Sequence, residues 1–323
     1  MELGHKLDIG PNCYEGQGIG ISNTPEACGG ELTEYYCSKG NDVLISCGGG
    51  ELMCETISKV DFERIRTAEP KWYMGFSDNT NMTFLLATLC DTAAIYAPCA
   101  AAFGMEPWHE SIFDAYRLLR GEIHSVHGYE LWEKEGLKDE EHPLLPYHVT
   151  EKRRMRVFLP VEKSEEHDIR KGMLQEMPIE DTRVTMEGRL IGGCLDCLVN
   201  LLGTKFDGVS EFAERYSGDG IIWFLEACDL NVMAIRRAIW QMKHAGWFSH
   251  IKGVLVGRPL AFGQELMGLD QYHAVCDLLA EYQVPVIMDV DLGHLPPMMP
   301  VICGSYAKIA AKGNDISIEM LEK

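Results

Sequence analysis

The sequence predicts a two-domain α/β protein. Its 323 residues are more than a single hydrophobic core usually holds. In the second half, short apolar runs alternate with segments of helical period, which is typical of a largely parallel sheet. The stretch 151–181 is rich in charge. We therefore expect an N-terminal Rossmann-like domain over 1–150, a connection over 151–181, and a C-terminal α/β domain over 182–323.

In the N-terminal half, two predicted strands each run into a turn of unusual composition. The apolar run 42–47 is followed by Gly48-Gly49-Gly50, and the run 71–76 is followed by Ser77-Asp78. After Ser77, apolar residues recur at helical spacing, at Met82, Leu85, Leu86 and Leu89. Further helices are predicted over 51–58 and 112–119.

The C-terminal half alternates more regularly. A continuous apolar run predicts a buried strand over 221–225, and further strands are predicted over 253–257 and 284–290. Helices are predicted between them, over 231–242 and 266–282. A hairpin is predicted over 308–320, turning at 312–315, where Gly and Asn favour a tight turn.

Charge and composition exclude several classes of protein. The formal net charge is −20, so the chain lacks the basic surface that binds nucleic acid or an anionic membrane. The N-terminus has no signal-peptide pattern and no apolar run is long enough to span a bilayer, which favours a cytoplasmic protein. The 12 cysteines are expected to be reduced there. Cys194 and Cys197 form a single CxxC, a weak zinc signal that is more typical of a helix start facing the core.

Three polar residues lie at or just beyond the carboxyl ends of predicted strands: Ser77, Glu226 and His294. In open α/β sheets this edge is where ligands bind. Ser77 also sits on a sharp strand-to-helix turn, where a helix N-terminus favours developing negative charge. Each residue has a simpler interpretation. Ser77 could be a helix cap, Glu226 could pair with Arg236, and His294 could belong to a proline-rich turn.

Residues 71–80, which read KWYMGFSDNT, closely resemble the serine motif of the LD-carboxypeptidase family. That family includes murein tetrapeptide LD-carboxypeptidases and microcin C self-immunity proteins. Other segments resemble the family's motifs in the same order: Gly49-Gly50 its glycine loop, Tyr96-Ala97-Pro98 the step after the serine helix, 187–193 the entry to its C-terminal domain, 223–226 the strand with its glutamate, and Gly293-His294 its histidine loop.

The resemblance implies a serine hydrolase whose active site lies between the two domains. Ser77 would be the nucleophile, His294 the base, and Glu226 the residue that orients the imidazole. Backbone N–H groups of Gly49 or Gly50 and of Asp78 would form the oxyanion hole. The resemblance implies a homodimer and no metal or organic cofactor.

The resemblance leaves two classes of substrate open. One branch of the family removes a terminal D-amino acid from muropeptides, and the other cuts an amide in peptidyl or aminoacyl nucleotides. The segment 128–147 resembles the second branch slightly more, with Trp132 placed to stack on a flat base. Alternatively, Trp132 simply packs on the core.

The chain departs from the family pattern at three places. The family begins with an additional strand and helix, its Gly-Gly-Asn motif ends in Cys194 here, and Ala227 follows the glutamate where an acid is common. The absent strand would expose a sheet edge.

Two other functions remain open. A catalytically silent binding protein could retain the pocket, and a reactive thiol at Cys47 or Cys194 could act if a helix N-terminus lowered its pKa.

Overall fold

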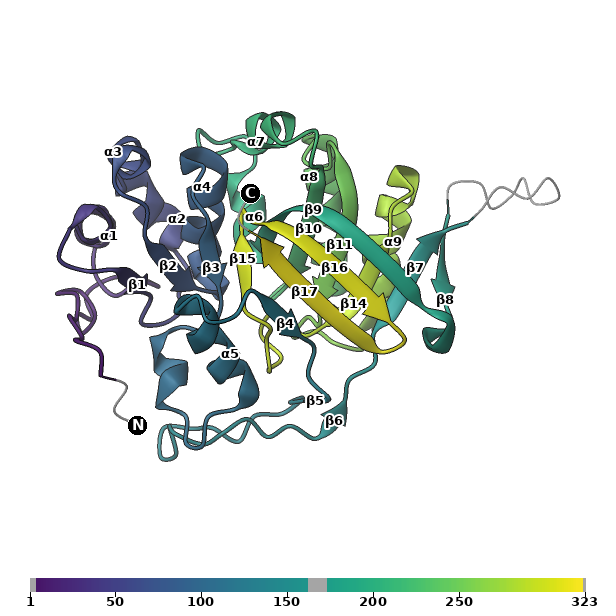
Figure 1. The fold of residues 1–323 in the computed structure, drawn as a ribbon, viewed down its shortest axis with the longest axis horizontal. Helices are drawn as coiled ribbons and strands as arrows, with labels where there is room; N and C mark the ends of the chain where they lie inside the picture. Colours follow the sequence, from purple (N-terminus) through teal and green to yellow (C-terminus); the bar gives the residue numbers. More distant parts are fainter. Residues whose placement is uncertain (1–3, 162–172, 322–323) are drawn as a thin grey trace.

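The computed structural model describes residues 4–161 and 173–321. Its strands form two main sheets, one of four strands built mostly from the first hundred residues and one of nine strands built mostly from the rest (Figure 1). Helices cover both sheets. This confirms the predicted two-domain α/β fold.

The first sheet has the order β1-β2-β3-β15. Its strands β1 (Val43–Ile45), β2 (Trp72–Gly75) and β3 (Ala94–Tyr96) are parallel, whereas β15 (Val301–Cys303) pairs antiparallel with β3. Its helices are α1 (Pro25–Cys37), α2 (Met53–Thr56), α3 (Phe62–Thr67), α4 (Thr80–Cys90) and α5 (Glu110–Leu119). Nearly every side chain of α4 is buried, because α4 packs between this sheet and the second domain.

The second sheet has the order β4-β17-β16-β9-β10-β11-β14-β7-β8. Its centre is parallel: β9 (Arg183–Cys194), β10 (Ile221–Glu226), β11 (Ile251–Gly257) and β14 (Val286–Val290). Antiparallel strands flank it: β16 (Tyr306–Lys312), β17 (Asp315–Leu321), β4 (Ser125–His127), β7 (Arg156–Pro160) and β8 (Leu174–Met177). The helices are α6 (Leu195–Leu201), α7 (Val209–Arg215), α8 (Val232–His244) and α9 (Gln271–Leu279).

The strands and helices mostly lie where the sequence predicts them, including the hairpin of β16 and β17. The prediction of one helix over 266–282 is wrong at its start. Residues 265–270 form a small hairpin of β12 (Glu265–Leu266) and β13 (Leu269–Asp270), and α9 begins only at Gln271. Met267 and Gly268 turn the hairpin with φ of 54° and 80°, and Asp270 then caps α9.

The predicted connection 151–181 carries more structure than expected. It contains β6 (Glu151–Lys152), which pairs with β5 (Leu131–Trp132), together with β7 and β8 of the second sheet. Residues 162–172 of this segment lie outside the described part of the chain. The domain boundaries themselves remain predictions.

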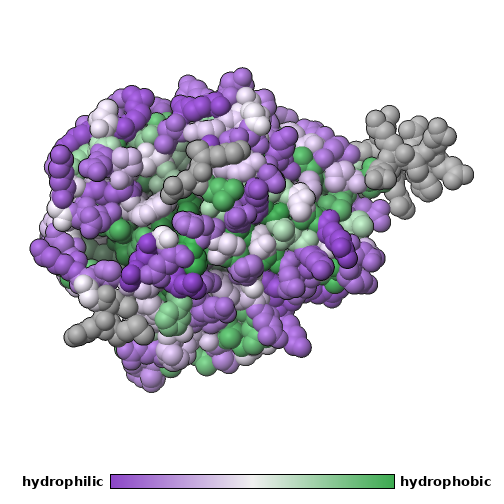
Figure 2. Space-filling model, viewed as in Figure 1, coloured by the Kyte–Doolittle hydropathy of each residue, from purple (hydrophilic) through white to green (hydrophobic). Residues whose placement is uncertain are grey.

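Most side chains on the face shown in Figure 2 are hydrophilic, and hydrophobic ones gather in a band across its middle. Among the described residues, no helix is both long and apolar enough to cross a membrane.

A buried ion pair fixes the loop that follows β14. Arg258, after β11, is 1% exposed and donates to Asp291 Oδ1 at 2.6 Å and to the Asp289 carbonyl at 2.9 Å. Asp291, which is fully buried, also accepts the Tyr129 N–H at 2.7 Å. Because each charge lies inside the protein with its partner, the loop is held at one place on the sheet.

We predict that Arg258→Leu lowers the free energy of unfolding by about 3–5 kcal/mol, because it removes the nearer of the two arginines that pair with the buried Asp291 carboxylate and leaves only Arg153, at 3.4 Å. The control is Arg236→Leu, which breaks the half-exposed pair of Arg236 with Asp277 on the surface and should cost no more than about 1 kcal/mol. Urea unfolding of both variants measures the difference. Equal losses of unfolding free energy in the two variants would contradict the idea that the buried Arg258 pair stabilises the fold more than a surface pair does.

Candidate active site

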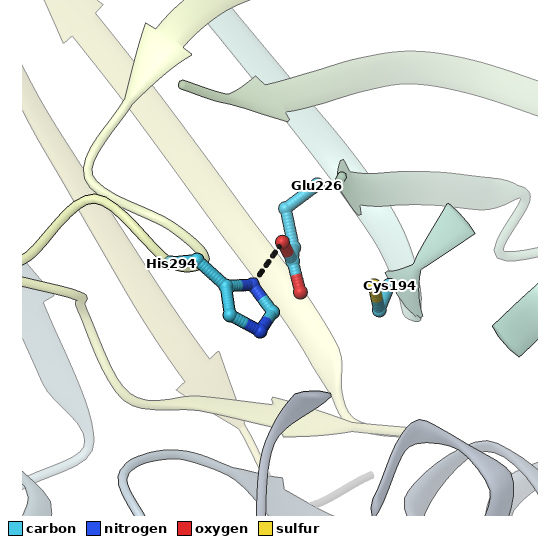
Figure 3. A group of neighbouring side chains, drawn as sticks. All are labelled: Cys194, Glu226 and His294. Atoms are coloured by element: carbon cyan, nitrogen blue, oxygen red, sulfur yellow. Dashed lines mark hydrogen bonds and ion pairs between the residues drawn. The ribbon is translucent and has the colours of Figure 1, made fainter. Parts of the chain in front are cut away.

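The structure brings together the three residues that the sequence singles out. Ser77 follows β2, Glu226 is the last residue of β10, and His294 lies in the loop after β14. His294 Nε2 lies 2.9 Å from Ser77 Oγ, and His294 Nδ1 lies 2.8 Å from Glu226 Oε2 (Figure 3 shows the second of these contacts). The three side chains therefore form one continuous hydrogen-bonded chain across the two domains.

Ser77 sits on a tight turn rather than serving as a helix cap. Its φ is 63°, a left-handed value that is costly for a residue with a Cβ, by about 1–3 kcal/mol. No side-chain cap is present on the short 3₁₀ helix at Ser77–Asn79 or on α4. The simpler interpretation of Ser77 as a cap is therefore wrong. The turn instead directs the hydroxyl to His294, and strain of this kind is typical of functional sites.

Glu226 is a buried carboxylate with two partners. It is 1% exposed, and its second oxygen, Oε1, accepts a hydrogen bond from the Tyr96 hydroxyl at 2.6 Å. The same hydroxyl accepts the Ser77 N–H at 3.2 Å. Tyr96 thus links both ends of the chain of three residues, a role that the sequence did not reveal. The simpler interpretation, a pair with Arg236, is wrong, because Arg236 donates to Asp277 and the His273 carbonyl.

The electrostatics make His294 a strong base. Burial alone lowers its pKa, but the Glu226 carboxylate and an interaction with the Cys228 thiol outweigh burial and raise the pKa above its ordinary value. The negative charge of Glu226 therefore favours a proton on the imidazole. That is the charge state that forms when a histidine accepts the proton of a hydroxyl nucleophile.

The glycine loop lies against the serine turn. A Cβ built on Gly49 would meet Ser77 Oγ at 3.3 Å, and one on Gly50 would meet the Asp78 carboxylate at 2.9 Å. Within the described residues, neither the Gly49 nor the Gly50 N–H donates to another protein group. These donors are therefore available to a ligand beside Ser77.

Asp78 and Asn79 fasten this loop. The Asp78 carboxylate accepts the Met53 N–H at 2.8 Å, and burial raises its pKa. Asn79 Nδ2 donates to the Gly48 carbonyl at 2.8 Å. The sequence did not reveal this role of Asn79, although an amide inside the serine motif, two residues after Ser77, was the available signal.

Trp132 is covered in this structure. Its side chain is in β5 and 5% exposed, with Phe262 at a centroid distance of 5.1 Å and the Arg258 guanidinium 4.8 Å from the ring centre. Its neighbour Glu133 donates its N–H to the Pro296 carbonyl at 2.7 Å, near the His294 loop. The predicted stacking of Trp132 on a base would require this ring to be uncovered.

A cysteine borders the three residues. Cys194 Sγ, a Glu226 oxygen and a His294 ring nitrogen all lie within 4.8 Å of one another. Figure 3 shows Glu226 between His294 and Cys194. The hydrogen bond with Cys197, together with burial, raises the pKa of Cys194, contrary to the lowered value that a reactive thiol requires.

Comparison with known proteins shows the family of the chain. The model of the LD-carboxypeptidase N-terminal domain matches residues 1–97, and that of the C-terminal domain matches residues 187–309. The chain belongs to the LD-carboxypeptidase family. Members of this family are serine peptidases, and Ser77 and Glu226–His294 fall in the two matched domains.

Two bacterial relatives of this LD-carboxypeptidase family member are similar to it in sequence over most of its length. A Streptomyces coelicolor carboxypeptidase is 23% identical over 293 residues, 90% of this chain and 75% of the relative. One from Vibrio cholerae is 23% identical over 84% of this chain and 73% of the relative.

The solved structures share the fold. The microcin C7 self-immunity protein MccF, bound to aspartyl sulfamoyl adenosine, matches with a TM-score of 0.72 at 20% identity, covering 97% of this chain and 85% of that one. An MccF-like protein from Bacillus anthracis matches with a TM-score of 0.69 at 20% identity, covering 94% of this chain and 84% of that one.

We predict that the His294 ring titrates well above the ordinary histidine pKa of about 6.5. Glu226→Gln should lower this pKa, because it removes the negative charge that favours the imidazolium. NMR titration of the ring resonances measures both values. A wild-type pKa at or below the ordinary value, or one unchanged in the variant, would contradict the coupling between Glu226 and His294.

Proposed function

We propose that this chain is a serine hydrolase that cleaves an amide bond through Ser77, His294 and Glu226. The observation that carries the proposal is the continuous chain of hydrogen bonds, at 2.9 Å and 2.8 Å, from the serine hydroxyl to a buried carboxylate. It is supported by the strained turn at Ser77 and by the neighbouring glycine loop, where the N–H groups of Gly49 and Gly50 donate to no protein group in the described part of the chain.

In the proposed reaction, Ser77 Oγ attacks the amide carbonyl while its proton moves to His294 Nε2. Glu226 holds His294 Nδ1 and stabilises the imidazolium that forms. The N–H groups of Gly49 or Gly50 and of Asp78 stabilise the negative oxygen, each contributing about 3–4 kcal/mol. His294 then protonates the departing amine, and water releases the acyl group from Ser77 by the same steps.

Two substrate classes are proposed: an aminoacyl or peptidyl nucleotide, and the L,D-amide of a muropeptide. The first is favoured by solved relatives that bind glutamyl sulfamoyl guanosine or aspartyl sulfamoyl adenosine, and by the resemblance of segment 128–147. The second rests on the family description. A cytoplasmic location and a homodimer also remain predictions.

The alternative is a catalytically silent homologue that only binds such ligands. A silent protein has no need for a serine on a strained turn, a histidine and a buried glutamate in hydrogen-bonding order. The retained geometry therefore favours the hydrolase.

We predict that the protein hydrolyses either a muropeptide ending in D-Ala or an aminoacyl sulfamoyl adenylate, and that Ser77→Ala reduces the rate by at least about 10⁴-fold. Product formation by mass spectrometry is the measurement. The matched control is Ser210→Ala, an exposed serine of α7, which should retain full activity.

A serine-directed fluorophosphonate should label the wild type and Ser210→Ala but not Ser77→Ala. Absence of both labelling and hydrolysis in a folded wild type would favour the silent homologue.

We also predict that Tyr96→Phe lowers kcat/KM by about 10–100-fold, because the buried Glu226 charge loses a hydrogen bond worth roughly 1.5–3 kcal/mol. The control is Tyr216→Phe, which removes a hydroxyl bonded to Asp91 at the surface. Steady-state kinetics on the substrate identified above compare the two. Equal kcat/KM values in Tyr96→Phe, Tyr216→Phe and the wild type would show that the Tyr96 hydroxyl does not contribute to catalysis.

A further inference from the structure

One cluster at the active site has the composition of a metal site. Cys194 ends β9, Glu226 ends the neighbouring strand β10, and His294 reaches them from the loop after β14. Their ligand atoms lie within 4.8 Å of one another, and Cys194 and Glu226 are each about 1% exposed. Two adjacent parallel strands fix the first two residues, since Glu226 pairs with Cys194 in the sheet register.

The three side chains suit one kind of ion. Thiolate, imidazole and carboxylate are the ligands that zinc takes, at about 2.0–2.3 Å, and three protein ligands leave a fourth position for water. A thiolate also selects against magnesium and calcium, which prefer oxygen ligands alone. To reach zinc distances, the three ligand atoms must draw together around a common centre.

We propose that Cys194, Glu226 and His294 bind a zinc ion, and that zinc bound there inhibits the enzyme. On binding, the Cys194 thiol proton and any proton on the coordinated imidazole nitrogen pass to solvent, and no electron is transferred. Zinc on Nδ1 would remove the hydrogen bond from His294 to Glu226. Zinc on Nε2 would remove the nitrogen that accepts the Ser77 proton. Either way the bound ion interrupts the same chain of hydrogen bonds.

Cys197 is not a member of this group of three, although its thiol hydrogen-bonds the Cys194 thiol. Cys197 Sγ is directed to the serine turn, where it lies 3.6 Å from the Ser77 carbonyl and 3.8 Å from Asp78 Oδ1. Cys197→Ser is the matched control for Cys194→Ser, because its hydroxyl keeps a hydrogen-bonding group beside Cys194 while the proposed thiolate ligand stays in place.

The experiment replaces zinc with Co²⁺, whose ligand-to-metal charge-transfer absorption in the near ultraviolet reports a thiolate ligand. The wild type should develop this band on titration with Co²⁺ and lose it when Zn²⁺ is added. Cys197→Ser should keep the band, Cys194→Ser should lose it, and Glu226→Gln should weaken cobalt binding by at least ~10-fold. Circular dichroism checks that each variant is folded.

Absence of the band in the wild type, or its loss in Cys197→Ser as well, would overturn the proposed ligand set. This measurement needs no substrate, so it is independent of the proposed function; only the inhibition rests on that function. With an active preparation, zinc should abolish hydrolysis, EDTA should restore it, and Cys194→Ser should need at least ~10-fold more zinc for half-inhibition of its own rate. Zinc binding without loss of activity would overturn the inhibitory role.

Discussion

The buried negative charge of Glu226 is the constraint around which the site is organised. A carboxylate with 1% exposure is unfavourable inside a protein unless each oxygen has a partner. Here one oxygen bonds His294 from the C-terminal domain and the other bonds Tyr96 from β3 of the first sheet. Through Tyr96 the same charge reaches the Ser77 N–H. The hydrogen bonds that pair this one charge therefore connect the two domains beside the serine turn.

The surrounding fold limits how far the histidine can move. Asp291 is the first residue of the histidine's loop and is held by Arg258, which directly follows β11, and by the Tyr129 N–H. On the other side of the site, Asn79 and Asp78 tie the serine turn to the glycine loop and to the start of α2. The reacting groups are thus carried by turns, but those turns are anchored to strands at several points, which is the arrangement that preorganises a catalytic site.

The sequence predicts the strands of the parallel core well, because 221–225 is a continuous apolar run and 253–257 and 284–290 are apolar apart from glycines and Asp289, the pattern of strands in a doubly covered sheet. It also locates Ser77, Glu226 and His294, through strand ends and family resemblance. It does not reveal Tyr96, whose partner Glu226 is 130 residues away. The hairpin at 265–270 was missed because Met267 adopts a left-handed turn that its residue type does not announce.

The pairing of β15 with β3 has a consequence for the order in which the protein is made. A ribosome releases Ser77 and the three parallel strands of the first sheet early, but the fourth strand, Val301–Cys303, only after more than two hundred further residues. Glu226 and His294 also emerge late. The first sheet therefore stays incomplete during most of synthesis, and its β3 edge is the segment that a chaperone would have to shield. The hydrogen-bonded chain of Ser77, His294 and Glu226 can therefore form only after His294 has been synthesised.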